Sequence, residues 1–140
     1  MHNLKEIALI LTLGAALHAH AADPERGEHL FRDCTACHSV IDETGTEIVR
    51  GGRTGPNLYG VIGRHAGSVP GFHYSPSMVE AGRRGLRWNE EHFVIYVRDA
   101  TAFLRTHLDD PEARGKMAYK LRDTEKAHDV WAYLERIATP

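Results

Sequence analysis

The sequence predicts an all-α domain of three to five short helices joined by long loops. Apolar residues recur at helical spacing near both ends of the chain and in its third quarter, and no run alternates as a strand would. The 140 residues amount to about one domain, and a composition of 42% hydrophobic and 26% charged residues excludes wholesale disorder. The net charge of −2 lacks the basic excess of nucleic-acid binders, so no nucleic-acid partner is expected.

Residues 1–21 are predicted to be a signal peptide. Their apolar run over 7–17 is shorter than the about 20 residues that span a bilayer. Small residues follow it at the positions that a signal peptidase reads, so we expect cleavage after Ala21 or Ala22 and a mature domain over 22–140. Export places a bacterial chain in the periplasm. A buried N-terminal helix or a retained anchor is the alternative.

The first and last predicted helices have clear start signals. Residues 23–25 supply an acidic N-cap, a proline at the first helical position and an acid in the first turn. That helix would place Gly27, Leu30 and Phe31 on one face. The last helix is expected to start near 123–124, and its apolar face consists of Ala127, Val130, Trp131, Leu134 and Ile137.

A third helix is predicted after residue 88. Asn89 is its expected cap, with Trp88 and Phe93 placed to pack across it as a hydrophobic staple. The apolar period that follows consists of Phe93, Tyr96, Val97 and Ala100.

The stretch 39–77 is predicted to be loop. It holds eight glycines and three prolines and shows no sustained period. A structureless segment of this length is unusual in a compact domain unless something large fills the middle. We therefore expect a sizeable apolar group at the centre, and a chain that folds poorly without it.

The strongest local signal is the string Cys34-Thr35-Ala36-Cys37-His38, which contains both cysteines of the chain. C-x-x-C-H is the attachment signature of c-type haem. The two thiols add across the two vinyl groups of the porphyrin, and the histidine that follows can donate an imidazole nitrogen to the iron. The string therefore predicts one covalently bound haem c, which would also be the expected central group.

Three other interpretations of the cysteine pair compete. A redox-active C-x-x-C would follow a strand in a thioredoxin-like unit, and no parallel β-α-β pattern surrounds this pair. A plain disulfide is possible in an oxidising compartment. A zinc site needs four ligands, and only one cysteine pair is available.

The residue on the second axial position of the iron decides the chemistry. Met1 would leave with the signal peptide, so Met78 and Met117 are the candidate thioethers. Met117 follows Gly115 in a loop ahead of the last helix, and glycine lets a backbone approach a flat ring closely. A thioether ligand raises the reduction potential relative to a second nitrogen ligand. Core packing is the alternative role for either methionine.

Six segments follow one another in a characteristic order: 34–38, 54–60, 63–64, 70–75, Trp88 and 115–117. Together they resemble class I cytochrome c, the family of the bacterial cytochromes c2 and mitochondrial cytochrome c. The resemblance runs from Gly27 to Leu134, essentially the whole mature chain. It implies the class I cytochrome c fold around one haem, with Gly27 and Phe31 of the first helix crossing Val130 and Tyr133 of the last.

The resemblance also implies roles for individual residues. Cys34 and Cys37 would form the thioether attachments, with His38 and Met117 as the axial ligands of the iron. The carbonyl of Pro56 would accept a hydrogen bond from the His38 ring and so fix its orientation.

Four further residues are implied around the haem. Tyr74 and Trp88 would donate hydrogen bonds to a haem propionate, and Arg64 would neutralise that buried charge. Tyr96 matches a family tyrosine whose hydroxyl lies near the methionine sulfur. Ordinary core packing is the alternative role for the three aromatic residues.

The chain departs from the family pattern in three places. The loops 39–53 and 97–116 are longer than in mitochondrial cytochrome c, and Met78 stands where the family commonly has an asparagine near the haem. The usual ring of lysines is reduced to Lys116, Lys120 and Lys126 in the mature chain. Arginines could replace it as a positive docking face, namely Arg83, Arg84, Arg87, Arg114 and Arg122.

The resemblance implies a monomeric one-electron carrier and no enzyme activity, because an iron with a ligand on each side has no position for a substrate. Its redox partners would be an oxidase, a cytochrome bc1-type complex, a reaction centre or a periplasmic dehydrogenase, met in weak and transient encounters, some at the membrane. A haem enzyme or gas sensor with an open sixth position is the alternative. The N-terminal place of the attachment motif differs from the class II cytochromes c′, which carry it near the C-terminus.

Overall fold

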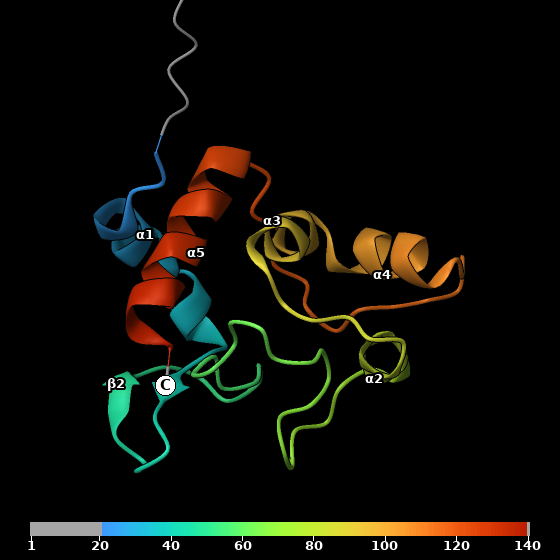
Figure 1. The fold of residues 1–140 in the computed structure, drawn as a ribbon, viewed down its shortest axis with the longest axis horizontal. Coiled ribbons are helices and arrows are strands. Elements are labelled where there is room, and N and C mark those ends of the chain that lie inside the picture. Colours follow the sequence, from blue (N-terminus) through green and yellow to red (C-terminus); the bar gives the residue numbers. More distant parts are fainter. Residues whose placement is uncertain (1–20, 140) are drawn as a thin grey trace, which may run out of the picture.

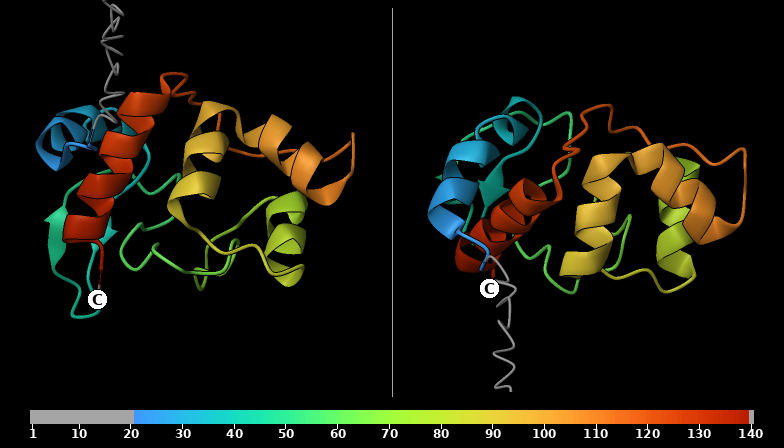
Figure 2. Two further views of the ribbon diagram at one scale, coloured as in Figure 1. Left: turned by 45° about the horizontal axis from the view of Figure 1, so that its top comes forward. Right: turned by 90° about the horizontal axis from the view of Figure 1, so that it is seen from above.

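The computed structural model describes residues 21–139, so the predicted signal peptide lies almost entirely outside the described residues. The helices form two groups, with α1 (Pro24–Phe31) and α5 (Thr124–Ile137) crossing on one side of the molecule (Figure 1). On the other side, α2 (Pro76–Arg83), α3 (Glu90–Arg98) and α4 (Ala100–Leu108) lie together (Figure 2). None of the helices in this part of the chain combines the length and apolar character needed to cross a membrane.

The α1–α5 crossing follows the sequence prediction. The Asp23 side chain caps α1, and Pro24 is its first residue. Gly27 lies directly against α5, where a Cβ at position 27 would overlap the Asp129 carbonyl and lie 2.9 Å from the Tyr133 Cβ. The rings of Phe31 and Tyr133 pack with centroids 5.4 Å apart. Only glycine permits this close approach of the two helix backbones.

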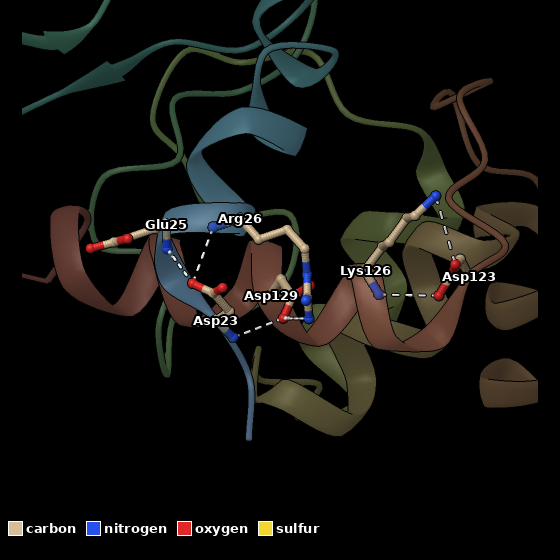
Figure 3. Close-up of polar contacts among 6 residues, drawn as sticks. All are labelled: Asp23, Glu25, Arg26, Asp123, Lys126 and Asp129. Atoms are coloured by element: carbon tan, nitrogen blue, oxygen red, sulfur yellow. Dashed lines mark hydrogen bonds and ion pairs between the residues drawn. The ribbon is translucent and has the colours of Figure 1, made fainter. Parts of the chain in front are cut away.

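A buried carboxylate fastens the same two helices (Figure 3). The side chain of Asp129 on α5 is 1% exposed. It accepts hydrogen bonds from Arg26 Nε at 2.5 Å, from Arg26 Nη2 at 3.0 Å and from the Asp23 amide at 2.8 Å. Because a buried charge is costly without a partner, this arrangement ties the start of α1 to α5.

The long predicted loop contains two short strands that the sequence did not indicate, and a helix begins at its end. Strands β1 (Val40–Ile41) and β2 (Glu47–Val49) pair antiparallel, with Val40 opposite Val49. The expectation of no strand is wrong here, because strands of two and three residues are too short to display an alternating pattern. Helix α2 begins at the end of the stretch, where Ser75 caps it and Pro76 is its first residue.

The helix predicted after residue 88 forms, but it ends earlier than the apolar period suggested. Asn89 caps α3 by accepting a hydrogen bond from the His92 amide at 2.8 Å, as predicted. Helix α3 ends at its C-cap Asp99, whose backbone is extended (φ −163°, ψ 99°) and which is also the N-cap of α4. Ala100 therefore belongs to a separate helix, α4, which was not predicted. The last helix starts at Thr124 behind its cap Asp123, as expected.

Candidate functional site

A cavity of about 330 Å³ is lined by residues of α1, α2, α3 and α5 and by residues of the segment 54–75. All nine residues that the sequence analysis assigned to a cofactor line it: Cys34, Cys37, His38, Pro56, Arg64, Tyr74, Trp88, Tyr96 and Met117. They come from segments far apart in the sequence, which the fold brings to one place. Most of the remaining wall is apolar.

The two cysteines present free thiols at the cavity wall. A short 3₁₀ turn, η1 (Cys34–Ala36), follows α1 and presents Cys34 half-buried and Cys37 exposed. Burial, and then the neighbouring charge of Asp33, raise the pKa of the Cys34 thiol to about 11. A redox-active thiol has a lowered pKa, so the environment of Cys34 does not suit a thioredoxin-like motif.

His38 is held in one orientation by the loop opposite it. The Gly55 amide donates to the Cys37 carbonyl at 2.8 Å, which pins that loop to the cysteine motif. The next carbonyl, of Pro56, lies 2.8 Å from His38 Nδ1. A carbonyl can only accept, so Nδ1 carries the proton and Nε2 keeps its lone pair. Burial lowers the pKa of His38, against the opposing effect of the Pro56 hydrogen bond, and this favours the neutral imidazole that a metal requires.

Arg64 brings a buried cation to the cavity. Its Nη1 donates to the Tyr59 carbonyl at 2.8 Å and its Nη2 to the Asn57 carbonyl at 3.1 Å. Its Nε is buried and has no hydrogen-bond partner within residues 21–139. Burial lowers the pKa of Arg64. A buried guanidinium that has an unused N–H, and no ion pair with a carboxylate among residues 21–139, suits an anionic group in the cavity.

Three aromatic residues surround the same space. The Tyr74 hydroxyl accepts a long hydrogen bond of 3.4 Å from the Val69 amide, so its own hydrogen is free to be donated. Trp88 and Tyr96 pack edge to face with ring centroids 4.9 Å apart. Burial raises the pKa of Tyr96 to about 12, so its hydroxyl stays protonated and can act as a donor.

Both candidate thioethers reach the cavity. Met117 is half-buried and lies in the segment between α4 and α5. Met78 projects from α2 and is 6% exposed. The fold therefore does not by itself decide between them.

Several wall residues were missed by the sequence analysis. Val61 and Phe72 line the cavity from the long loop, and Leu121 lines it from the segment after Met117. Val61 and Leu121 lie outside every periodic segment and motif, whereas Phe72 lies in the segment 70–75, which gives it no role by itself. Tyr119, which is 41% exposed, lines the edge of the cavity and donates to Asp33 at 3.4 Å; its place two residues after Met117 was the one available hint.

Comparison with known proteins identifies the family. The chain is 49% identical over 122 residues to cytochrome c2 of Cereibacter sphaeroides, which covers 86% of this chain and 84% of that protein. It is 48% identical over 132 residues to cytochrome c-551 of Roseobacter denitrificans, covering 94% and 93% of the two chains. The crystal structure of cytochrome c2 from Rhodobacter sphaeroides superposes with a TM-score of 0.83 at 49% identity, covering 85% of this chain and 98% of the other. The chain belongs to the cytochrome c2 family.

This membership confirms the class I cytochrome c fold, the single covalently attached haem c and the role of electron carrier that the sequence predicted. No protein-family model matches the chain.

The cavity of this cytochrome c2 fits a haem. Its apolar wall suits the porphyrin, and the neutral His38 imidazole and two methionine thioethers are suitable iron ligands. The free thiols of Cys34 and Cys37 lie on the wall from which the attachment bonds would form. The unpartnered Nε of Arg64 suits the carboxylates of a haem, which are the only anionic groups that the cofactor carries.

Proposed function

We propose that this cytochrome holds its haem through thioether bonds from Cys34 and Cys37 and binds the iron with His38 and Met117. The observation that carries the proposal is the 2.8 Å contact between His38 Nδ1 and the Pro56 carbonyl. It leaves Nε2 as the one ring nitrogen that can donate to a metal, and histidines that ligate metals commonly have such a partner.

When bound, the haem supplies reversible exchange between Fe(III) and Fe(II). The chain controls the surroundings of that exchange. The apolar walls exclude water, Arg64 balances negative charge in a buried place, and the Tyr74 hydroxyl and Trp88 indole have hydrogens to donate there. With both His38 and Met117 bound to it, the iron would have no position left for a substrate, which supports electron transfer rather than enzymatic turnover.

We place this electron transfer in the periplasm, in a monomer whose partners are an oxidase, a cytochrome bc1-type complex, a reaction centre or a periplasmic dehydrogenase. Four exposed cations lie within five residues of Met117 in the sequence, namely Arg114, Lys116, Lys120 and Arg122, and Lys116 also lines the cavity. Such a group favours brief, salt-dependent encounters with acidic surfaces of redox partners, including membrane complexes.

The visible spectrum of the oxidised protein tests the ligand assignment. Low-spin, six-coordinate iron with a sulfur-to-iron charge-transfer band is expected. Met117→Ala should abolish that band, because it removes the proposed sulfur ligand. Met78→Ala is the matched control: it also removes a thioether from the cavity wall, and it should destabilise the fold by about 2–5 kcal/mol while the band remains.

Two results would contradict the proposal. Loss of the band in Met78→Ala, with retention in Met117→Ala, would assign the ligand to Met78. High-spin iron in the unchanged protein that binds carbon monoxide readily would favour the haem enzyme or gas sensor instead.

A further inference from the structure

The segment that leads to Met117 rests on helix α4. Gly115 lies so close to this helix that a Cβ at position 115 would be 3.1 Å from the Ala100 Cβ and 3.5 Å from Leu104 Cδ1. In the same place the Gly115 amide donates a hydrogen bond of 3.1 Å to the hydroxyl oxygen of Thr101. The backbone two residues before Met117 is therefore in direct contact with α4.

Helix α4 provides a firm base for this contact. Its residues Ala100, Phe103, Leu104 and Leu108 are all buried. The helix packs against α2 and α3, as Figure 2 shows. Burial of this much apolar surface fixes the helix in place, and with it the Thr101 hydroxyl. The Thr101 side chain that reaches Gly115 is short and β-branched. Such side chains have restricted χ1, so the position of the hydroxyl is well defined.

Other contacts of the segment lie farther from Met117 along the chain or act through flexible side chains. Arg105 Nε donates to the Ala113 carbonyl at 3.2 Å, and the Arg114 amide donates to Ser77 Oγ at 3.0 Å. The exposed Lys116 side chain reaches the His73 carbonyl at 2.6 Å. Of the contacts that fix the backbone through a short side chain, the hydrogen bond from the Gly115 amide to Thr101 is nearer to Met117 than the bond from the Arg114 amide to Ser77.

We infer that Thr101 is a positioning residue for the sixth ligand: its hydroxyl holds the backbone at Gly115 and so keeps the Met117 thioether at the iron. This inference rests on the proposed function, in which Met117 is that ligand. Helix α4, part of the region that is longer than in mitochondrial cytochrome c, thereby acquires a role in the redox site although α4 supplies no iron ligand.

Competition with added imidazole tests the inference in the oxidised holoprotein. Imidazole can occupy the iron only in molecules whose thioether has left it, so its apparent affinity reports how often the Met117 segment detaches. Thr101→Val keeps the shape of the side chain and removes the acceptor. Loss of one hydrogen bond should raise the apparent affinity for imidazole about fivefold. The sulfur-to-iron band should also disappear at a lower temperature.

Two variants complete the test. Thr101→Ser restores a hydroxyl and should return the affinity for imidazole to that of the unchanged protein. Thr106→Val makes the same change on the exposed face of α4 and should leave the affinity unchanged. The midpoint of urea unfolding, measured on all four proteins, shows whether any change is merely general destabilisation.

The inference is overturned if Thr101→Val and Thr106→Val bind imidazole equally, or if Thr101→Ser behaves like Thr101→Val. It is also overturned if the affinity rises only in proportion to a lower unfolding midpoint. Failure of the proposed function is recognised separately, because Met117→Ala would then keep the sulfur-to-iron band.

Discussion

Arg64 shows how a single residue can control the site without touching the iron. Two of its nitrogens are fixed by backbone carbonyls, of Tyr59 and Asn57, and its Nε is left for a group in the cavity. Because the guanidinium is buried, its charge is screened far less than that of a surface arginine. A buried positive charge favours the reduced iron, which has one positive charge fewer than the oxidised iron.

Replacement of this cation should therefore be visible in the reduction potential. We expect Arg64→Leu to lower the potential by tens of millivolts, on the order of 1 kcal/mol for a one-electron couple. Arg83→Leu removes the same charge from an exposed position on α2 and is the control, with a much smaller effect. Redox titration of both variants gives the answer, and equal shifts would show that burial of Arg64 has no influence.

The sequence predicted those residues of the site that lie in local motifs. Cys34, Cys37 and His38 form one string with its own chemistry, so they needed no tertiary information. The assignment of Met117 depended on the family resemblance. Val61 and Phe72 were not assigned to the site, because the glycine-rich stretch predicts a large central group but not which of its own side chains line the cavity.

Among the elements, the α1–α5 pair has the most specific contacts. The Asp129 carboxylate is buried at the crossing and accepts from Arg26 and from the backbone of Asp23 (Figure 3). Asp129 is the buried member of the pair, whereas the Arg26 side chain is 40% exposed, so the charge-assisted hydrogen bonds from Arg26 offset the cost of burying the carboxylate. The pair therefore connects the first helix, α1, to the last helix, α5.

We expect Asp129→Asn to lower the thermal midpoint of the holoprotein by on the order of 10 °C, because it weakens the charge-assisted hydrogen bonds at the crossing. The new amide keeps an acceptor for Asp23 but removes the charge opposite Arg26. Glu125→Gln is the control, since it neutralises an exposed acid in the first turn of the same helix. Calorimetry on the two variants would contradict this view if their midpoints fell equally.

Helices α2 and α4, which were not predicted, show where helix prediction from apolar periodicity fails. The apolar spacing of Phe93, Val97 and Ala100 continues across Asp99, although the chain bends there into an extended residue. An aspartate can cap a helix or lie within one, and only tertiary packing decides between the two. Helix α2 has just two buried residues, Met78 and Ala81, which is too few to establish a period.

For the whole molecule, the arrangement of the core makes the haem part of the fold. The cavity of about 330 Å³ has mainly apolar walls, to which the α1–α5 pair and helices α2 and α3 all contribute. Buried side chains from both groups, such as Phe93 and Leu134, face it. Without a central group these surfaces would be left without contacts, and a chain of this size has little other core to compensate.

Removal of the haem should consequently abolish cooperative folding. We expect the haem-free protein to lose its fixed tertiary packing, and to show no cooperative transition in far-UV circular dichroism on heating, whereas the holoprotein melts in one step. The α1–α5 contacts, which do not need the cavity to be filled, are the ones most able to persist as residual helix. Holoprotein taken through unfolding and refolding is the control for damage during preparation. A haem-free chain with a native-like, cooperative melt would contradict this prediction. It would mean that the helices pack together without the haem, and that the haem is not required for cooperative folding.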